Sequence, residues 1–292
     1  MIEHLKIHAD GPTFSRIIAG AWRWHTVSAD VVERLIQTSL DLGITTFDHA
    51  DIYGDHGNEE IFGNILRKNP SLRKKMELVS KCGIKFPSAK RQATWVKHYD
   101  TSKEHIIWSA ENSLKMLGTD HLELLLIHRP DPLLDPEVVA DAFSQLRQQG
   151  KVLHFGVSNF TPSQFRMLQR ITPFPLVTNQ IEISLSCIDS LFNGDLDLML
   201  ELGVSPMAWS PLAGGKTLHV DEREVFNKAV KYNASYSQLS LAWLMKHPSV
   251  IFPIIGTTKP ERITEAAGAA EVKLDLQDWF EMLKWVMGKE MP

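Results

Sequence analysis

The feature that most restricts the fold of this chain is an alternation of short apolar strands with amphipathic helices. Residues 122–127 form an almost continuous apolar run, which is typical of strands that are covered on both faces. Ser28 is placed to cap a helix in which Val32, Leu35 and Ile36 share one face. The chain supplies eight such strand–helix units at intervals of roughly thirty to forty residues. Because helical crossovers join parallel strands, eight units predict a (β/α)8 TIM barrel.

Turn and capping residues set the expected bounds of these elements. The turn sequence Asp10-Gly11-Pro12 predicts a short N-terminal β-hairpin that pairs residues 5–7 with 13–15. Two capping boxes are expected, Thr101 with Glu104 and Thr161 with Gln164. The expected strands cover residues 16–19, 44–47, 78–80, 122–127, 154–157, 176–181, 204–209 and 250–255. The main expected helices cover residues 29–40, 58–66, 102–117, 136–149, 188–202, 222–231, 237–246 and 276–286, with others beginning at Pro162 and Pro260.

One domain is the better interpretation of the 292 residues, although this length would also fit two domains. No linker, low-complexity tract or shift in composition divides the chain. An open doubly wound sheet would usually carry a glycine-rich phosphate turn after its first strand, and residues 20–24 do not form one. We therefore expect a single barrel domain over residues 1–292.

Composition and charge exclude several classes of function. A net charge of −4 argues against a general nucleic-acid or anionic-membrane binder. The two cysteines, Cys82 and Cys187, lack ligand spacing, and the twelve histidines show no H-x-H or H-x-x-E-H pattern, so no disulfide or metal site is predicted. No apolar run approaches the ~20 residues of a spanning helix, and the N-terminus lacks a signal-peptide core. The expectation is a cytoplasmic monomer that acts on a small molecule.

Four polar residues fall at places where a barrel would bring them together. Asp48 ends a predicted strand, Tyr53 follows it, and Lys81 and His128 end two later strands. Active sites of such barrels lie at the carboxyl ends of the strands. A lysine beside a phenol favours the phenolate, and an aspartate beside the lysine keeps it charged, so Tyr53 becomes a general acid. Taken singly, each residue would more often be a loop cap or a solvated charge, and only their combination favours catalysis.

Short motifs in the same order resemble those of the aldo-keto reductases. They are residues 47–54, Lys81, 125–128, 156–160, 179–180, 209–212 and 260–263, and the run 125–136 resembles the bacterial oxidoreductase branch. The resemblance implies a barrel that binds NADPH across its mouth without a Rossmann fold. It also implies reduction of an aldehyde or ketone to an alcohol, with Tyr53 as proton donor, Lys81 and Asp48 in support, and His128 orienting the carbonyl.

The resemblance also implies the cofactor contacts. Ser158, Asn159 and Gln180 would bind the nicotinamide carboxamide, Trp209 would stack on the nicotinamide ring, and Ser210 and Leu212 would lie along the pyrophosphate. Thr257, Lys259 and Arg262 would bind the 2′-phosphate, a dianion that suits cationic donors near a helix N-terminus. Two departures concern the adenosine end, because Gly256 and Ala266 stand where many members have lysine and asparagine.

Tryptophans and loops complete the expected mouth. Trp22 and Trp24 follow the first strand and are expected to line the carbonyl pocket, with residues 85–100 and 214–220 as rims. Trp108 and Trp243 lie within helices and are expected in the core, and Cys82 is expected to be a packed apolar residue.

Two other functions stay open at this point. The same barrel could serve as a cofactor-sensing regulatory subunit, as in the potassium-channel β-subunits. A metal-dependent barrel isomerase or aldolase is disfavoured by the absence of ligand spacing. Turnover of carbonyl compounds and metal analysis would separate these alternatives.

Overall fold

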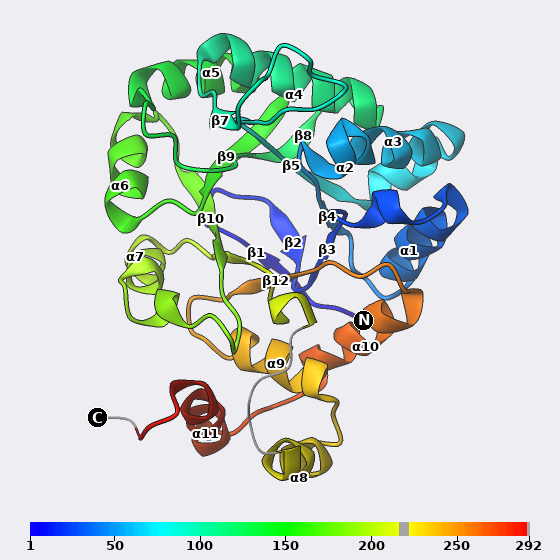
Figure 1. Ribbon diagram of the computed structural model, residues 1–292, viewed down its shortest axis with the longest axis vertical. Coiled ribbons are helices and arrows are strands. Elements are labelled where there is room, and N and C mark those ends of the chain that lie inside the picture. Colours follow the sequence, from blue (N-terminus) through cyan, green and yellow to red (C-terminus); the bar gives the residue numbers. More distant parts are fainter. Residues whose placement is uncertain (216–221, 291–292) are drawn as a thin grey trace.

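Eight parallel strands close into a barrel that helices surround (Figure 1). The computed structural model describes residues 1–215 and 222–290. The ring closes where the last strand pairs with the first, with Ile254 opposite Ile18. The barrel strands are β3 (Ile18–Gly20), β4 (Thr46–Asp48), β5 (Glu77–Cys82), β8 (Leu122–Ile127), β9 (Val152–Ser158), β10 (Leu176–Glu182), β11 (Met207–Trp209) and β12 (Phe252–Ile255). The predicted (β/α)8 barrel is confirmed.

Amphipathic helices connect the strands and pack their apolar faces against the barrel. Val32, Leu35 and Ile36 of the first helix are fully buried, as the spacing of its apolar residues predicts. The helices are α1 (Ala29–Asp41), α2 (Tyr53–His56), α3 (Asn58–Lys68), α4 (Lys103–Leu117), α5 (Pro136–Gln148), α6 (Pro162–Ile171), α7 (Asp195–Leu202), α8 (Glu222–Tyr232), α9 (Tyr236–Met245), α10 (Pro260–Ala267) and α11 (Leu276–Met287). Short 3₁₀ turns are η1 (Trp24–Thr26), η2 (Pro70–Lys75), η3 (Asp189–Leu191), η4 (Ala213–Gly215) and η5 (Gly268–Glu271).

The caps confirm one predicted capping box and correct the other. Thr161 and Gln164 make both reciprocal bonds at the start of α6. At α4 the cap is Ser102, whose hydroxyl accepts from the backbone N–H of His105, so the box assigned to Thr101 was wrong. Thr101 instead donates to Asp131 at 2.8 Å, which removes its hydroxyl from the helix end.

The helix expected over residues 188–202 is broken. It consists of η3 followed by α7, with Gly194 at φ 91° between them. The backbone N–H of Asp195 is capped by the side chain of Asn193 at 2.9 Å, so the chain starts a new helix there. The left-handed glycine and the asparagine outweigh the continuous apolar pattern.

The predicted N-terminal hairpin is confirmed, and it closes the amino-terminal end of the barrel. β1 (His4–Lys6) and β2 (Thr13–Ser15) pair antiparallel with Leu5 opposite Phe14. Phe14 is fully buried and packs with inward side chains of the strands. The backbone N–H of Ser15 donates to the Thr46 hydroxyl at 3.0 Å, which ties the hairpin to the start of β4. A second hairpin, β6 (Ile84–Lys85) with β7 (His98–Tyr99), projects after β5.

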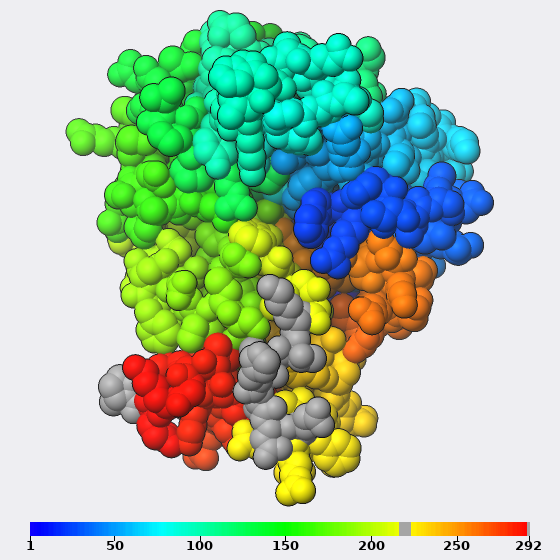
Figure 2. Space-filling view, in the orientation of Figure 1, coloured from blue at the N-terminus to red at the C-terminus, as the bar shows by residue number. Residues whose placement is uncertain are grey.

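The last helix, α11, lies outside the ring of strands in Figure 1 and forms the red surface at the lower left of Figure 2. Its Asp278 accepts hydrogen bonds from Lys228 and Lys231 of α8, and these ion pairs join the two helices. Among the described helices, none has both the length and the apolar character needed to cross a membrane.

Candidate active site

Lys81 is the centre of the candidate site. Its side chain is 0% exposed at the end of β5, and Asp48, 3% exposed, lies at the end of the neighbouring strand β4. The ammonium donates to Asp48 Oδ2 at 2.7 Å, to the carbonyl oxygen of His49 at 2.8 Å and to the Tyr53 hydroxyl at 2.9 Å. Barrel closure thus brings together three of the four predicted catalytic side chains in direct contact.

These three bonds use all the protons of the ammonium. The phenol oxygen of Tyr53 is therefore an acceptor toward Lys81, and its own proton is directed elsewhere. The carbonyl of His49 was not foreseen from the sequence, because a backbone acceptor has no residue signature. The turn from β4 into α2 places it there.

Burial and neighbouring charge act in opposite directions on Lys81. Burial lowers its pKa, but Asp48 and Tyr53 beside it raise the pKa above its ordinary value. Lys81 therefore remains an ammonium at neutral pH. For Tyr53, burial raises the pKa and exceeds the lowering caused by Lys81, so the net shift is upward. Lys81 does lower the pKa of Tyr53, as the sequence predicts, but burial has the larger effect, and Tyr53 keeps its proton at neutral pH.

His128 follows β8 and lies against the tyrosine. The ring centroids of Tyr53 and His128 are 5.9 Å apart at 77°, an edge-to-face contact. Burial, with further contributions from Lys81 and Arg129, holds the pKa of His128 well below its usual value. The imidazole is therefore neutral and offers one N–H donor. Its Nδ1 is buried without a hydrogen-bond partner among the described residues.

A hydrogen-bonded chain joins the predicted nicotinamide-binding residues to the lysine. Gln180 Nε2 donates to Asp48 Oδ1 at 2.9 Å, so Gln180 holds the carboxylate oxygen that Lys81 leaves free. Ser158 Oγ donates to the Gln180 carbonyl at 2.9 Å, and Asn159 Nδ2 donates to Ser158 Oγ at 2.7 Å. Trp209 Nε1 donates to Asn159 Oδ1 at 2.9 Å.

Two residues of this region have unusual backbones. Asn159 has φ 60° and Ser210 has φ 50°, both in the left-handed region that non-glycine residues rarely adopt. Such strain is typical of ligand-binding positions. Both follow strand ends at which cofactor contacts were predicted.

Arg129 is a residue of the mouth that the sequence interpretation did not single out. Its guanidinium carbon lies 5.3 Å from the centroid of the Trp209 ring, a cation–π contact. Its charge also lowers the pKa of Tyr53 and of His128. The only indication in the sequence was its place directly after the predicted His128.

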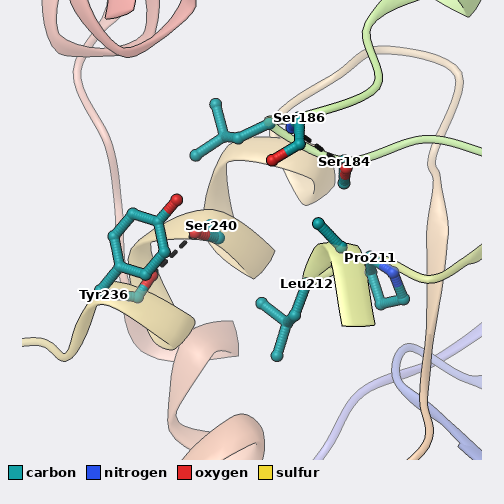
Figure 3. Close-up of a pocket in the computed structure, with 8 residues that line it drawn as sticks. Ser184, Ser186, Pro211, Leu212, Tyr236 and Ser240 are labelled. Carbon is teal, nitrogen blue, oxygen red and sulfur yellow. Dashed lines mark hydrogen bonds between the residues drawn. The ribbon is translucent and has the colours of Figure 1, made fainter. Parts of the chain in front are cut away.

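A narrow cavity of about 10 Å³ lies beyond Ser210, between the loops that follow β10 and β11 and helix α9 (Figure 3). Leu212, one of the predicted pyrophosphate contacts, lines it beside Pro211. Tyr236 and Ser240 line it from α9, and Ser184 and Ser186 from the loop after β10 (Figure 3).

The predicted 2′-phosphate residues lie at the start of α10. Lys259 is its N-cap residue and Arg262 is in its first turn, and both side chains are exposed. Thr257 Oγ1 accepts from the backbone N–H of Lys259 at 3.1 Å.

The two tryptophans predicted to line the pocket differ in exposure. Trp22 is 54% exposed, beside Arg23, and stays a candidate for the pocket wall. Trp24 is 2% exposed and packs against Phe47 and Phe62 in the core, so the prediction that it lines the substrate pocket was wrong.

Three further residues were expected to be buried, and two of them are. Trp243 and Cys82 are buried as expected, but Trp108 is 41% exposed and was wrongly assigned to the core. The rim expected at 85–100 contains the β6–β7 hairpin. Most of the rim expected at 214–220 lies outside the described residues. Within residues 1–215 and 222–290, no group of three or more His, Cys, Asp or Glu is arranged to hold a metal ion.

Comparison with known proteins agrees with this geometry. A model of the Aldo/keto reductase family matches residues 16–284. Oxidoreductase YdhF of Escherichia coli is 48% identical over the full length of both chains. A 6-dehydroglucose reductase of Agrobacterium fabrum is 45% identical, covering 97% of this chain and 98% of that protein.

Among solved structures, the thermostable aldo-keto reductase Tm1743, crystallised with the inhibitor epalrestat, has a TM-score of 0.85 at 24% identity. The match covers 97% of this chain and all of that one, and it shows a shared fold. The chain therefore belongs to the aldo/keto reductase family and is a nicotinamide-dependent oxidoreductase of carbonyl compounds.

Proposed function

We propose that this protein reduces an aldehyde or ketone to an alcohol with NADPH, and that Tyr53 is the proton donor. The observation that carries the proposal is the hydrogen bonding of Lys81. Its three protons are all taken, one by the Tyr53 oxygen, so the phenol proton is left for another acceptor.

The chemistry follows from the charges around Tyr53. When bound, NADPH supplies the hydride to the carbonyl carbon. Tyr53 gives its proton to the carbonyl oxygen as negative charge develops there, and the phenolate left behind gains a charge-assisted hydrogen bond from Lys81. Asp48 keeps Lys81 charged and oriented, and Gln180 fixes Asp48. The neutral imidazole of His128 donates its N–H to the same carbonyl oxygen and orients it.

The residues of the mouth fit a nicotinamide cofactor. Trp209 is half-buried and offers an aromatic face, and Ser158 and Asn159 provide polar groups beside it. Leu212 lines the narrow cavity beside α9, and Lys259 and Arg262 supply cationic groups at the start of α10 for a 2′-phosphate. The cationic pair supports NADPH over NADH.

Steady-state oxidation of NADPH with a panel of aldehydes and ketones tests the reaction. The panel includes sugar aldehydes, because one relative is named a 6-dehydroglucose reductase. Tyr53→Phe should lower kcat by about 100- to 10,000-fold, the usual contribution of a general acid. Tyr232→Phe, on α8 and outside the mouth, is the matched control and should retain activity.

Fluorescence titration of the same variants with NADPH and NADH separates binding from chemistry. Tyr53→Phe should still bind NADPH, and NADPH should bind more tightly than NADH. Full activity of Tyr53→Phe would refute the assigned donor. Tight NADPH binding without turnover of any carbonyl would instead favour a cofactor-sensing regulatory subunit.

A further inference from the structure

We propose that Asn58 is a positioning residue, which fixes Trp22 relative to Tyr53 and so favours carbonyl substrates large enough to reach the tryptophan. The inference rests on the proposed function, in which Tyr53 is the proton donor and Trp22 belongs to the wall of the carbonyl pocket. Asn58 is the first residue of α3 and is 3% exposed. It is not one of the four catalytic side chains and acts through its neighbours.

The side-chain amide of Asn58 holds the chain that follows β3. Its Nδ2 donates to the carbonyl oxygen of Ala21 at 2.7 Å and to that of Trp22 at 3.1 Å. Carbonyl oxygens only accept, so the NH₂ group of the amide must face them. The Trp22 ring is 54% exposed and contacts Arg23, so little packing fixes the ring itself. Its position therefore depends on the backbone that Asn58 holds.

The same amide lies against the turn that follows Tyr53. Gly54 has φ 60°, and a Cβ atom added there would lie 2.2 Å from Asn58 Oδ1, which is closer than two such atoms can approach. The next two residues, Asp55 and His56, have φ 52° and 61°. Residues other than glycine rarely adopt this left-handed region, and such strain persists only where the surroundings fix it. The turn thus brings Asn58 into contact with the residue next to the proton donor.

The start of α3 is anchored to the strand that carries Lys81. Glu59, the second residue of the helix, accepts from the Ser80 hydroxyl at 2.6 Å, and Ser80 directly precedes Lys81 on β5. Both side chains are buried. A line of direct contacts therefore runs from the strand of the lysine through the start of α3 to the backbone of Trp22. Support of this kind holds the groups of a functional site in their productive geometry.

The chain beyond Trp22 is held independently of Asn58. Trp24 is buried, and its Nε1 donates to the carbonyl oxygen of Thr257 at 3.1 Å. Removal of the Asn58 amide should therefore release Ala21 and Trp22 without displacing the rest of this segment. Asn58 Oδ1 has no hydrogen-bond partner among the described residues, so the side chain serves as a donor.

The test compares the smallest and the largest aldehyde that the wild type reduces, with propanal and benzaldehyde as the first pair. In Asn58→Ala, KM for the larger aldehyde should rise about fivefold or more, the size expected for loss of one aromatic contact. The value of kcat for both aldehydes, and KM for the smaller one, should stay within about twofold of the wild type. The ratio of the two kcat/KM values does not depend on the fraction of enzyme that is folded, so partial unfolding cannot imitate this result.

Matched variants on the same helix control for general effects. Asn64 is exposed and accepts from Arg67 at 2.9 Å, so Asn64→Ala should leave the ratio unchanged. Asn58→Ser keeps a single donor for two carbonyl oxygens and should give an intermediate ratio. The serine variant replaces the alanine variant if the latter does not fold.

A double-mutant cycle shows whether Asn58 acts through Trp22. In a Trp22→Ala background, Asn58→Ala should have no further effect on the ratio. A further fall there, or an equal loss of kcat with both aldehydes, would assign Asn58 a general structural role and overturn the inference. An unchanged ratio in Asn58→Ala would overturn this inference alone, whereas failure of the wild type to reduce any carbonyl compound would refute the proposed function and this inference with it.

Discussion

The two ends of the barrel differ in what their buried side chains do. At the amino-terminal floor, Phe14 of the hairpin packs on apolar side chains of the strands. At the mouth, Lys81 and Asp48 are equally buried but charged. In β4 the two ends are only two residues apart, since Thr46 bonds the hairpin and Asp48 bonds Lys81.

The difference shows how stability and chemistry are divided. Burial of apolar side chains stabilises the fold, whereas desolvating an ion pair costs free energy that its attraction repays only in good geometry. Apolar packing at the amino-terminal end therefore stabilises the fold, whereas the buried charges at the carboxyl end support Tyr53. Variants at the two ends should separate the effects on stability from the effects on catalysis.

The largest effect is expected for Lys81→Met. The variant leaves the buried Asp48 carboxylate without its cation, which should lower the free energy of unfolding by about 3–5 kcal/mol. Loss of the cation that stabilises the Tyr53 phenolate should also lower kcat by about 100-fold or more. Urea denaturation and steady-state kinetics measure the two quantities. Adding Asp48→Leu should restore much of the stability and none of the activity. Recovery of both would contradict the view that these charges serve catalysis and not stability.

Phe14→Ala should affect stability alone. Truncation of a fully buried phenylalanine costs about 3–5 kcal/mol through lost contacts and the cavity left behind. Below the temperature at which the variant unfolds, kcat and KM should match the wild type. A fall in kcat comparable to that of Lys81→Met would show that the floor also positions the catalytic groups.

Asp51→Asn should change the pH dependence of stability, by less per pH unit than either variant above changes stability itself. Burial raises the folded-state pKa of Asp51 to about 7, above the value of about 4 in the unfolded chain. The folded state then holds more protons between these values, so Asp51 reduces stability as pH rises from about 4 to about 7. Asparagine does not titrate, so stability should no longer fall with pH for this reason. The slope of stability against pH should become smaller by up to about 1.4 kcal/mol per pH unit. Parallel curves for variant and wild type would contradict the shift.

Much of the fold could be predicted because its signals are local. The apolar run of β8, the Ser28 cap and the box at Thr161 all depend on neighbours within one element. The Thr101 box failed because a distant acceptor, Asp131, took its hydroxyl. The break at Gly194 was missed because backbone handedness outweighed an apolar pattern.

The sequence alone determined which polar residues end which strands, because strand periodicity and punctuation are written in short segments. It therefore placed Asp48, Tyr53, Lys81 and His128 at one end of a barrel. Only the tertiary structure decided the partners of the three Lys81 protons, the burial of Trp24, the exposure of Trp108 and the bonds from Asn58 to the chain after β3. These depend on side chains that meet only when the barrel closes, and no local pattern records such distances.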